Sequence, residues 1–268
     1  MMNKNFISLF ALVVMSISTL ANGWHITTRY YNLPDDNQQQ RVEHIYLYGN
    51  NMKMEAGNLS TIFLLDQNQI LYMNHSNKTY WRGNPQRFVS EVRAELVASI
   101  EQNLIDVDAD KQEEVRAMYM EMIDASFTDK SVVPSKVFSV KELNGRQVIG
   151  GFSATKYEVS EEGFLLENIW VTKDLPISNE FDFISLNHFL NQLAQGAYAD
   201  SFESSQEYFS LLDKGYPVKV EIRRGDGSIQ VSEVISAIRV FLTDSDFAVP
   251  ADYTAGSLAT VGVWEGYM

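Results

Sequence analysis

Turn-forming residues recur about every ten positions between residues 24 and 82, and this rhythm favours a fold built on a sheet. Gly49-Asn50-Asn51, Gly57-Asn58 and Asp66-Gln67-Asn68 separate short stretches that are rich in apolar and aromatic residues. Such spacing is typical of an antiparallel meander, in which tight turns join consecutive strands. We therefore expect strands over residues 42–48, 52–56, 61–65, 70–74 and 78–82.

Two of these strands indicate how the sheet is covered. Met52 and Met54 alternate with Lys53 and Glu55, so one face of this strand is apolar and the other is charged. The stretch 61–65 is apolar on both faces, which predicts a strand that is covered on both sides.

After residue 84 the apolar residues recur every three to four positions, which indicates amphipathic helices. The first helix is expected over about 88–104, with an apolar stripe of Phe88, Val92, Leu96 and Ile100. The second is expected over about 111–127, with a buried stripe of Val115, Met118, Met122 and Ile123. Asp110 followed by Glu113 fits a capping box at its start. The two helices form an insert at about 84–130, and Pro134 ends it.

Met118 and Met122 share one face of the second helix. Flexible thioethers suit a surface that must adapt to variable apolar ligands. The alternative is that both side chains fill the core.

Strand patterns return after the insert. Residues 137–142 and 146–149 flank Asn144-Gly145, a strong signal for a hairpin turn. Further strands are expected over 156–159, 164–172, 218–224 and 228–241, and helices over about 183–195 and 204–212. The apolar residues of 228–241 change parity, which predicts a β-bulge near Ser232-Glu233. No linker or repeat interrupts the pattern, so we expect one α+β domain over 24–268.

The N-terminal residues have the pattern of a secretory signal peptide. Lys4 precedes a continuous apolar stretch at 6–20, and Ala21-Asn22-Gly23 provides small residues for cleavage after Ala21 or Gly23. The apolar stretch is shorter than the roughly 20 residues that a membrane-spanning helix needs, which disfavours a retained anchor. We therefore expect residues 1–23 to be removed, and a soluble periplasmic protein to begin near Trp24.

The overall charge excludes some partners. The formal net charge is −14, and it becomes −15 when Lys4 is removed. Nucleic acids and anionic membrane surfaces both require a basic protein surface, so neither is an expected partner. The chain has no Cys, so packing alone must hold the exported fold together.

The known catalytic and metal-binding motifs are incomplete. None of the four histidines forms a zinc-protease motif, and Thr155 breaks the nucleophile elbow suggested by Gly151-Phe152-Ser153. The acidic run 106–110 resembles a calcium loop, but Lys111 replaces the required glycine and Ala117 replaces the bidentate glutamate. We therefore expect no enzyme, no metal and no cofactor.

Several local sequences resemble the LolA/LolB-like half-barrels of the bacterial envelope, and most closely an uncharacterised family of exported bacterial proteins. They are the segment from Tyr46 to Glu55, the segment from Ile70 to Tyr80, the segment from Ile149 to Val159, and Phe247-Ala248-Val249-Pro250-Ala251. Members often have Cys where this chain has Ala154.

The resemblance implies a curved antiparallel sheet, with helices in or over its concave face. In the lipoprotein carriers of this group, the apolar space between sheet and helices shelters acyl chains. The implied function is that of a non-catalytic carrier for a lipid or a lipidated peptide. No ligand residue of the family can be assigned to a numbered position of this chain.

We expect the ligand to lie between the sheet and the helices of the insert. The residues expected to line this cavity are Met54, Ile62, Leu64, Tyr72, Phe88, Val92, Met118 and Met122. A second hypothesis is an envelope module that binds a protein partner and has a filled core without a ligand cavity. A third is a hydrolase that uses a carboxylate pair, which predicts two acidic residues converging in a cleft with strongly raised pKa values.

Overall fold

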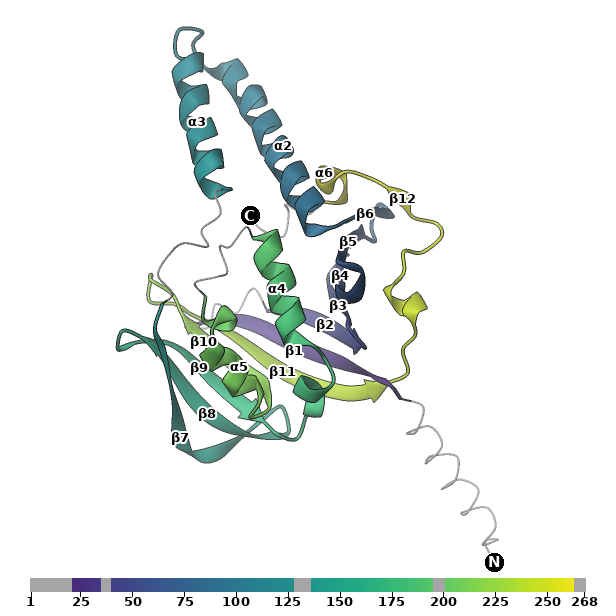
Figure 1. Ribbon diagram of the computed structural model, residues 1–268, viewed down its shortest axis with the longest axis vertical. Coiled ribbons are helices and arrows are strands. Elements are labelled where there is room, and N and C mark those ends of the chain that lie inside the picture. The colour runs from purple at the N-terminus through teal and green to yellow at the C-terminus, as the bar shows by residue number, and fades with distance from the viewer. Residues whose placement is uncertain (1–20, 35–39, 128–135, 195–200, 263–268) are drawn as a thin grey trace, which may run out of the picture.

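The computed structural model describes residues 21–34, 40–127, 136–194 and 201–262. Within these residues, twelve strands form one open sheet in the order β12-β6-β5-β4-β3-β2-β1-β11-β10-β9-β8-β7. The curved α+β architecture expected from the sequence is confirmed (Figure 1). Residues 1–20 of the predicted signal peptide 1–23 lie outside the described residues, as does the predicted end of the insert at Pro134.

The expected meander is present and forms one half of the sheet. Its strands pair antiparallel in chain order, and β12 then adds to β6 in parallel. The strands are β2 (Arg41–Tyr48), β3 (Asn51–Ala56), β4 (Leu59–Leu64), β5 (Gln69–Asn74), β6 (Thr79–Gly83) and β12 (Thr254–Ala255).

The centre of the sheet joins segments that are far apart in the sequence. β1 (Gly23–Leu33) lies between β2 and β11 (Ile229–Val240), and Ile26 faces both Ile45 and Ala237 across the sheet. The bulge predicted near Ser232-Glu233 is confirmed, and it lies two residues beyond Glu233. Thr27 pairs with Ser236 and Thr28 with Val234, so the extra residue is Ile235.

The other half of the sheet differs from the predicted arrangement at one turn. β7 (Phe138–Ile149) is a single strand that pairs along its length with β8 (Phe152–Glu161), so the predicted hairpin at Asn144-Gly145 is wrong. These residues form a bulge instead, between Glu142 and Arg146. The turn lies at Gly150-Gly151, where both glycines have positive φ, and this turn joins two long strands. β9 (Phe164–Thr172) and β10 (Tyr216–Arg223) complete this half.

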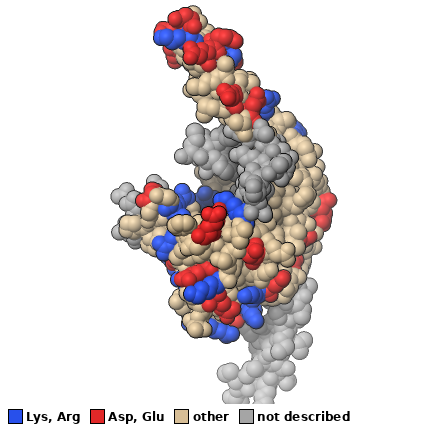
Figure 2. Space-filling model, turned by 60° about the vertical axis from the view of Figure 1, so that its left-hand side comes forward, with Lys and Arg blue, Asp and Glu red and all other residues tan. Residues whose placement is uncertain are grey.

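The helical insert projects from the sheet. α2 (Pro85–Asn103) and α3 (Gln112–Ser126) form an antiparallel pair whose connecting loop is the point farthest from the sheet (Figure 1). Figure 2 shows charged side chains gathered at this tip, which includes the ion pair between Asp108 and Lys111. No helix among the described residues has both the length and the apolar character needed to cross a membrane.

α3 differs from the prediction in two ways. It begins after Lys111 without a side-chain cap, so the predicted capping box of Asp110 and Glu113 is wrong. Met118 and Met122 are 51% and 58% exposed, so they are not on a buried stripe. The reason is that α3 packs on α2 rather than on the sheet, and this packing buries Ile123 against Ile100 and Leu104. α3 buries few side chains because it packs against a single helix, α2.

Two further helices cover the sheet itself. α4 (Phe183–Leu193) lies over β1 and β2, and α5 (Gln206–Leu212) lies over the half formed by β7 to β10 (Figure 1). The apolar residues of α5 join Phe138, Tyr157 and Ile169 in a separate cluster. α6 (Leu258–Val261) packs near β5 and β6.

The start of α2 depends on Asn84. Its side-chain oxygen accepts a hydrogen bond of 2.8 Å from the backbone N–H of Arg87, and Pro85 occupies the first helical position. Asn84→Ala is expected to lower the free energy of unfolding by about 1 kcal/mol, and Asn84→Ser to restore most of the loss. Urea unfolding measures both. Equal midpoints for the wild type and Asn84→Ala would contradict the capping role.

A candidate apolar ligand site between the sheet and two helices

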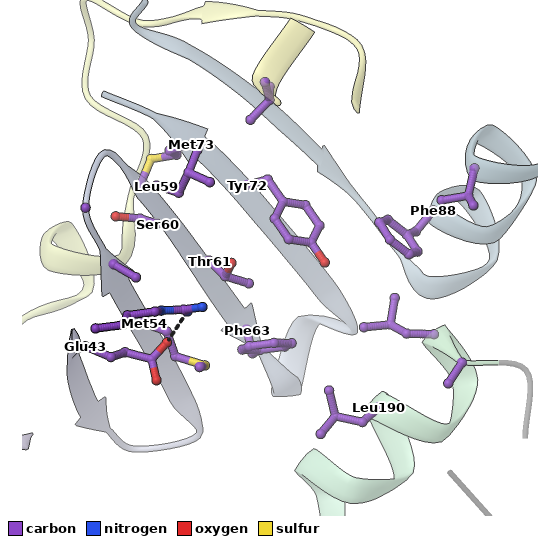
Figure 3. Close-up of a pocket in the computed structure, with 17 residues that line it drawn as sticks. Glu43, Met54, Leu59, Ser60, Thr61, Phe63, Tyr72, Met73, Phe88 and Leu190 are labelled. Carbon is purple, nitrogen blue, oxygen red and sulfur yellow. Dashed lines mark hydrogen bonds and ion pairs between the residues drawn. The ribbon is translucent and has the colours of Figure 1, made fainter. Parts of the chain in front are cut away.

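A cavity of about 740 Å³ separates the meander from α2 and α4 (Figure 3). Strands β2 to β5 provide one wall, and the two helices with α6 provide the other. Its lining residues are Arg41, Glu43, Met54, Ala56, Gly57, Leu59, Ser60, Thr61, Phe63, Tyr72, Met73, Phe88, Val92, Leu190, Leu193, Ala194 and Val261. Most of these side chains are apolar, so the site can shelter an apolar ligand from water.

The register of the meander selects the side chains of the sheet wall. Met54 pairs with Thr61, and Thr61 pairs with Tyr72, so the three lie side by side on the same face. Phe63 follows Thr61 by two residues and therefore shares that face. Its ring meets Phe189 of α4 edge-on, with 5.8 Å between centroids, and this contact anchors α4 beside the cavity.

The α2 wall depends on a cluster of three aromatic rings. Tyr72, Trp81 and Phe88 have centroids 5.6 to 6.2 Å apart. The indole N–H of Trp81 donates to Glu91 Oε2 at 2.5 Å, and the Arg87 guanidinium lies 5.4 Å from the Trp81 ring centroid. Trp81 therefore holds the first turns of α2 against the edge of the meander.

An ion pair between an exposed guanidinium and a buried carboxylate forms the polar end of the cavity. Glu43 is 2% exposed, and its Oε1 accepts a hydrogen bond of 3.2 Å from Arg41. Its Oε2 accepts one of 2.7 Å from the Tyr30 hydroxyl. Burial, and then the charge of Glu43, raises the pKa of Tyr30. The same two causes raise the pKa of Tyr216 to about 12, so both phenols stay protonated at neutral pH.

Four of the eight residues expected to line a cavity are placed around it. Met54 and Tyr72 lie on the sheet wall, and Phe88 and Val92 on the α2 wall.

The other four expected residues do not line the cavity. Ile62 and Leu64 lie on the opposite face of β4, where they pack with Leu242 and Phe247. The stretch 61–65 is apolar on both faces, so its sequence pattern does not indicate which of its side chains face the cavity. Met118 and Met122 lie on α3, which does not contribute to the cavity. α4 lines the cavity where the helix with Met118 and Met122 was predicted to lie.

The contributions of Glu43, Leu190 and Leu193 were not predicted. The pattern had predicted the helix over 183–195, and its apolar residues Phe183, Leu186, Phe189 and Leu190 carried a signal for a covering role. Glu43 gave no comparable signal, because a single glutamate in a strand is ordinarily exposed.

A serine of the cavity lining begins a hydrogen-bonded chain that continues through a histidine and a tyrosine. Ser60 Oγ lies 2.6 Å from His75 Nε2, and His75 Nδ1 lies 2.6 Å from the Tyr253 hydroxyl. Ser60 is 1% exposed, and its hydroxyl is turned away from Tyr72 and Phe88 (Figure 3). The chain of hydrogen bonds ties the C-terminal segment to the meander.

Two acidic residues interact at a different place, under α5. Burial, and then the charge of Glu203, raises the pKa of Glu167 to about 8. Neither residue lines the cavity. In the described part of the chain, no group of three or more His, Cys, Asp or Glu side chains is arranged to hold a metal ion.

The structure thus defines a class: an open, curved and mostly antiparallel sheet with an apolar cavity beneath covering helices. A family model described as "Domain of unknown function (DUF4412)" matches residues 107–253. This is more than half of the chain, and the chain belongs to that family. No curated protein sequence matches it.

Several solved structures are similar over most of this chain. PNGF-II is 11% identical with a TM-score of 0.35, over 91% of this chain and 33% of its own. The Pseudomonas aeruginosa MucA/MucB complex is 9% identical with a TM-score of 0.37, over 89% of this chain and 60% of the matched one. A LolA superfamily protein from Nitrosomonas europaea is 6% identical with a TM-score of 0.28, over 89% of this chain and 96% of its own.

The chain therefore spans about a third of PNGF-II. A LolA superfamily structure is among those to which the chain is similar, as the sequence resemblance indicated.

Proposed function

We propose that this protein is a non-catalytic carrier or binding protein for a hydrophobic ligand, either a lipid or a lipidated peptide. The observation that supports this most directly is the cavity of about 740 Å³ between the sheet and the helices. Its volume lies within the roughly 300–1,000 Å³ that is typical of small-ligand sites. The proposal includes export to the periplasm by residues 1–23 and a single domain over 24–268.

Burial alone can supply the affinity. Each methylene group removed from water contributes about 0.8 kcal/mol. Ten methylene groups therefore contribute about 8 kcal/mol, the standard free energy of a micromolar complex, from which the cost of association is subtracted. Such a site needs no catalytic group.

The cavity weighs against the alternative of an interaction module with a filled core. One observation still favours a protein partner. The projecting α3 exposes Met118 and Tyr119, and the loop before it exposes Ile105. Apolar side chains on a projecting element are suited to contact another protein. Met118→Ser should weaken a partner complex and leave lipid binding unchanged, which separates the two functions.

Native mass spectrometry of the protein purified from its host envelope tests the carrier proposal. We expect a bound lipid-sized mass, and we expect the Thr61→Phe variant to lose it. Thr61 lies between Met54 and Tyr72 on the cavity wall, so a phenyl ring there occupies the ligand volume. The dissociation constant for a fluorescent fatty-acid probe should rise by at least about tenfold, the effect of losing one or two buried methylene contacts.

Val148→Phe is the matched control, because Val148 is exposed on β7 and does not line the cavity. It adds a similar ring to a strand and should leave probe binding unchanged. Repeated purification without any bound lipid, together with no probe binding to the wild type, would refute the carrier function.

A further inference from the structure

We propose that the ligand is an amphiphile with an anionic headgroup, a carboxylate or a phosphate, which Arg41 binds at the polar end of the cavity. This inference rests on the proposed carrier function and specifies its ligand class. It is based on Arg41, the one cationic side chain in the cavity lining formed by the described residues.

Only the positive member of the ion pair can be reached by a ligand. Glu43 is 2% exposed, and its two oxygens accept hydrogen bonds from Tyr30 and Arg41. The Arg41 side chain, in contrast, is 59% exposed. A headgroup at this end of the cavity therefore meets a guanidinium, whereas the carboxylate is already enclosed by its two donors.

Arg41 retains most of its hydrogen-bonding capacity. A guanidinium has five N–H donors, and the hydrogen bond of 3.2 Å from Arg41 Nη2 to Glu43 Oε1 uses one of them. Within the described residues, Nε and Nη1 of Arg41 make no hydrogen bond. The planar fork of a guanidinium matches carboxylate and phosphate oxygens with two parallel N–H···O bonds. The free donors of Arg41 thus suit either of these headgroups.

Tyr30 and Glu43 hold the guanidinium in place. The Tyr30 hydroxyl donates to Glu43 Oε2 at 2.7 Å, and Glu43 Oε1 accepts from Arg41. The Arg41 guanidinium also lies 5.9 Å from the centroid of the Tyr30 ring. Because these contacts orient Arg41 before a ligand binds, they lower the entropic cost of forming the headgroup contact.

The charge of Glu43 weakens the attraction of an anion but does not cancel it. An anion at the free edge of a guanidinium lies about 4 Å from the positive charge and roughly 7 Å from a carboxylate on the opposite edge, so attraction exceeds repulsion. The net charge of −14 acts over longer distances, and salt screens it beyond about 8 Å. It therefore disfavours extended anionic surfaces more than one headgroup in contact with Arg41.

Arg41 lies where the headgroup of a bound amphiphile would be expected. Its partner Glu43 is at the opposite side of the cavity from Phe88, with Met54 and Phe63 between them (Figure 3). The strands from β2 to β5 span roughly 14 Å at the usual strand spacing. An acyl chain can extend over this apolar surface from a headgroup at β2.

Displacement of the neutral dye N-phenylnaphthylamine tests this inference with protein produced from the full-length sequence. The competing compounds share one dodecyl chain length and differ in the headgroup: dodecanoate, dodecyl phosphate, dodecanol and dodecyltrimethylammonium. We expect at least one of the two anions to bind about tenfold more tightly than dodecanol, the effect of one charge-assisted hydrogen bond. The ammonium compound should bind no more tightly than dodecanol. The tighter anion identifies the source of the headgroup, a fatty acid or a phospholipid.

Three variants assign the preference to Arg41. Arg41→Gln should reduce the affinity for both anions to that for dodecanol. Glu43→Gln keeps the guanidinium and removes the repulsion, so it should keep or increase the preference. Arg82→Gln is the matched control, because Arg82 is exposed, bonds to Gln67 and Gln69, and does not line the cavity. It should bind all four compounds as the wild type does.

The double variant Arg41→Gln/Glu43→Gln guards against misfolding of Arg41→Gln, since it leaves no unpaired buried carboxylate. It should show the same loss of preference. Equal affinities of the wild type for the anions and dodecanol, a preference for the ammonium compound, or an anion preference that persists without Arg41 would overturn the headgroup inference and leave the carrier function intact. Failure of all four compounds to displace the dye would overturn both.

Discussion

Replacement of Glu167 by glutamine is expected to stabilise the protein at pH 9 by roughly 3 to 5 kcal/mol and to change little at pH 4. Glu167 lies on β9, is 8% exposed and has its pKa raised to about 8, first by burial and then by Glu203 on the short helix Phe202–Ser204. The folded protein therefore holds this carboxyl in its protonated form at neutral pH.

The sign of the effect follows from proton binding. Between the ordinary glutamate pKa of 4.5 and the raised value of about 8, the folded state binds a proton that the unfolded state has released. Stability due to this group therefore falls as pH rises through this window, and the loss is complete above pH 8. Glutamine does not ionise, so it removes this part of the pH dependence.

Urea unfolding at several pH values between 4 and 9 measures the difference between Glu167→Gln and the wild type. Glu162→Gln is the control, since it removes the same charge from an exposed turn and should give a small difference at every pH. A difference for Glu167→Gln that stays constant from pH 4 to 9 would show that Glu167 does not titrate in this window.

Trp81→Ala is expected to lower the free energy of unfolding by about 3 to 5 kcal/mol and to weaken ligand binding. Trp81 is 1% exposed, and it packs against Phe88 while donating a hydrogen bond to Glu91. The substitution removes the side chain that holds the base of α2 beside the cavity. Gly83 permits this arrangement, since a Cβ atom there would collide with the Trp81 ring.

Hydrogen exchange separates the local from the global effect of this substitution. Compared with the wild type, Trp81→Ala should speed the exchange of the α2 amides more than that of the β10 and β11 amides, because only α2 loses its anchor. Trp81→Phe keeps most of the packing and should show a smaller change in both stability and exchange. Uniform acceleration across the whole sheet would contradict an anchoring role for Trp81.

Local patterns predicted most of the individual elements. The strands of the meander and the helices over 88–104 and 183–195 follow from turn residues and apolar periodicity within ten to twenty positions. One error occurred where two local signals competed. Asn144-Gly145 and Gly150-Gly151 can both form turns, and pairing of β7 along the whole of β8 selected the second.

The candidate site was only partly predictable, because its parts are distant in the sequence. Thr61 and Phe63 face the cavity instead of Ile62 and Leu64 because β4 pairs with β3 and β5 in one register. α4 covers the cavity, whereas α3 packs on α2 and leaves Met118 exposed. Neither choice is encoded in the periodicity of the segment itself.

The sequence by itself indicated a fold without disulfides, the α+β class and most of the strands and helices, since these depend on composition and on residues near one another. Only the tertiary structure decided which helix lies over the sheet, which face of β4 meets the cavity, and that Tyr30, Arg41 and Glu43 form its polar end. The physical reason is that burial and charge pairing are settled by contacts between distant segments, such as β1 with β11, which no local pattern specifies.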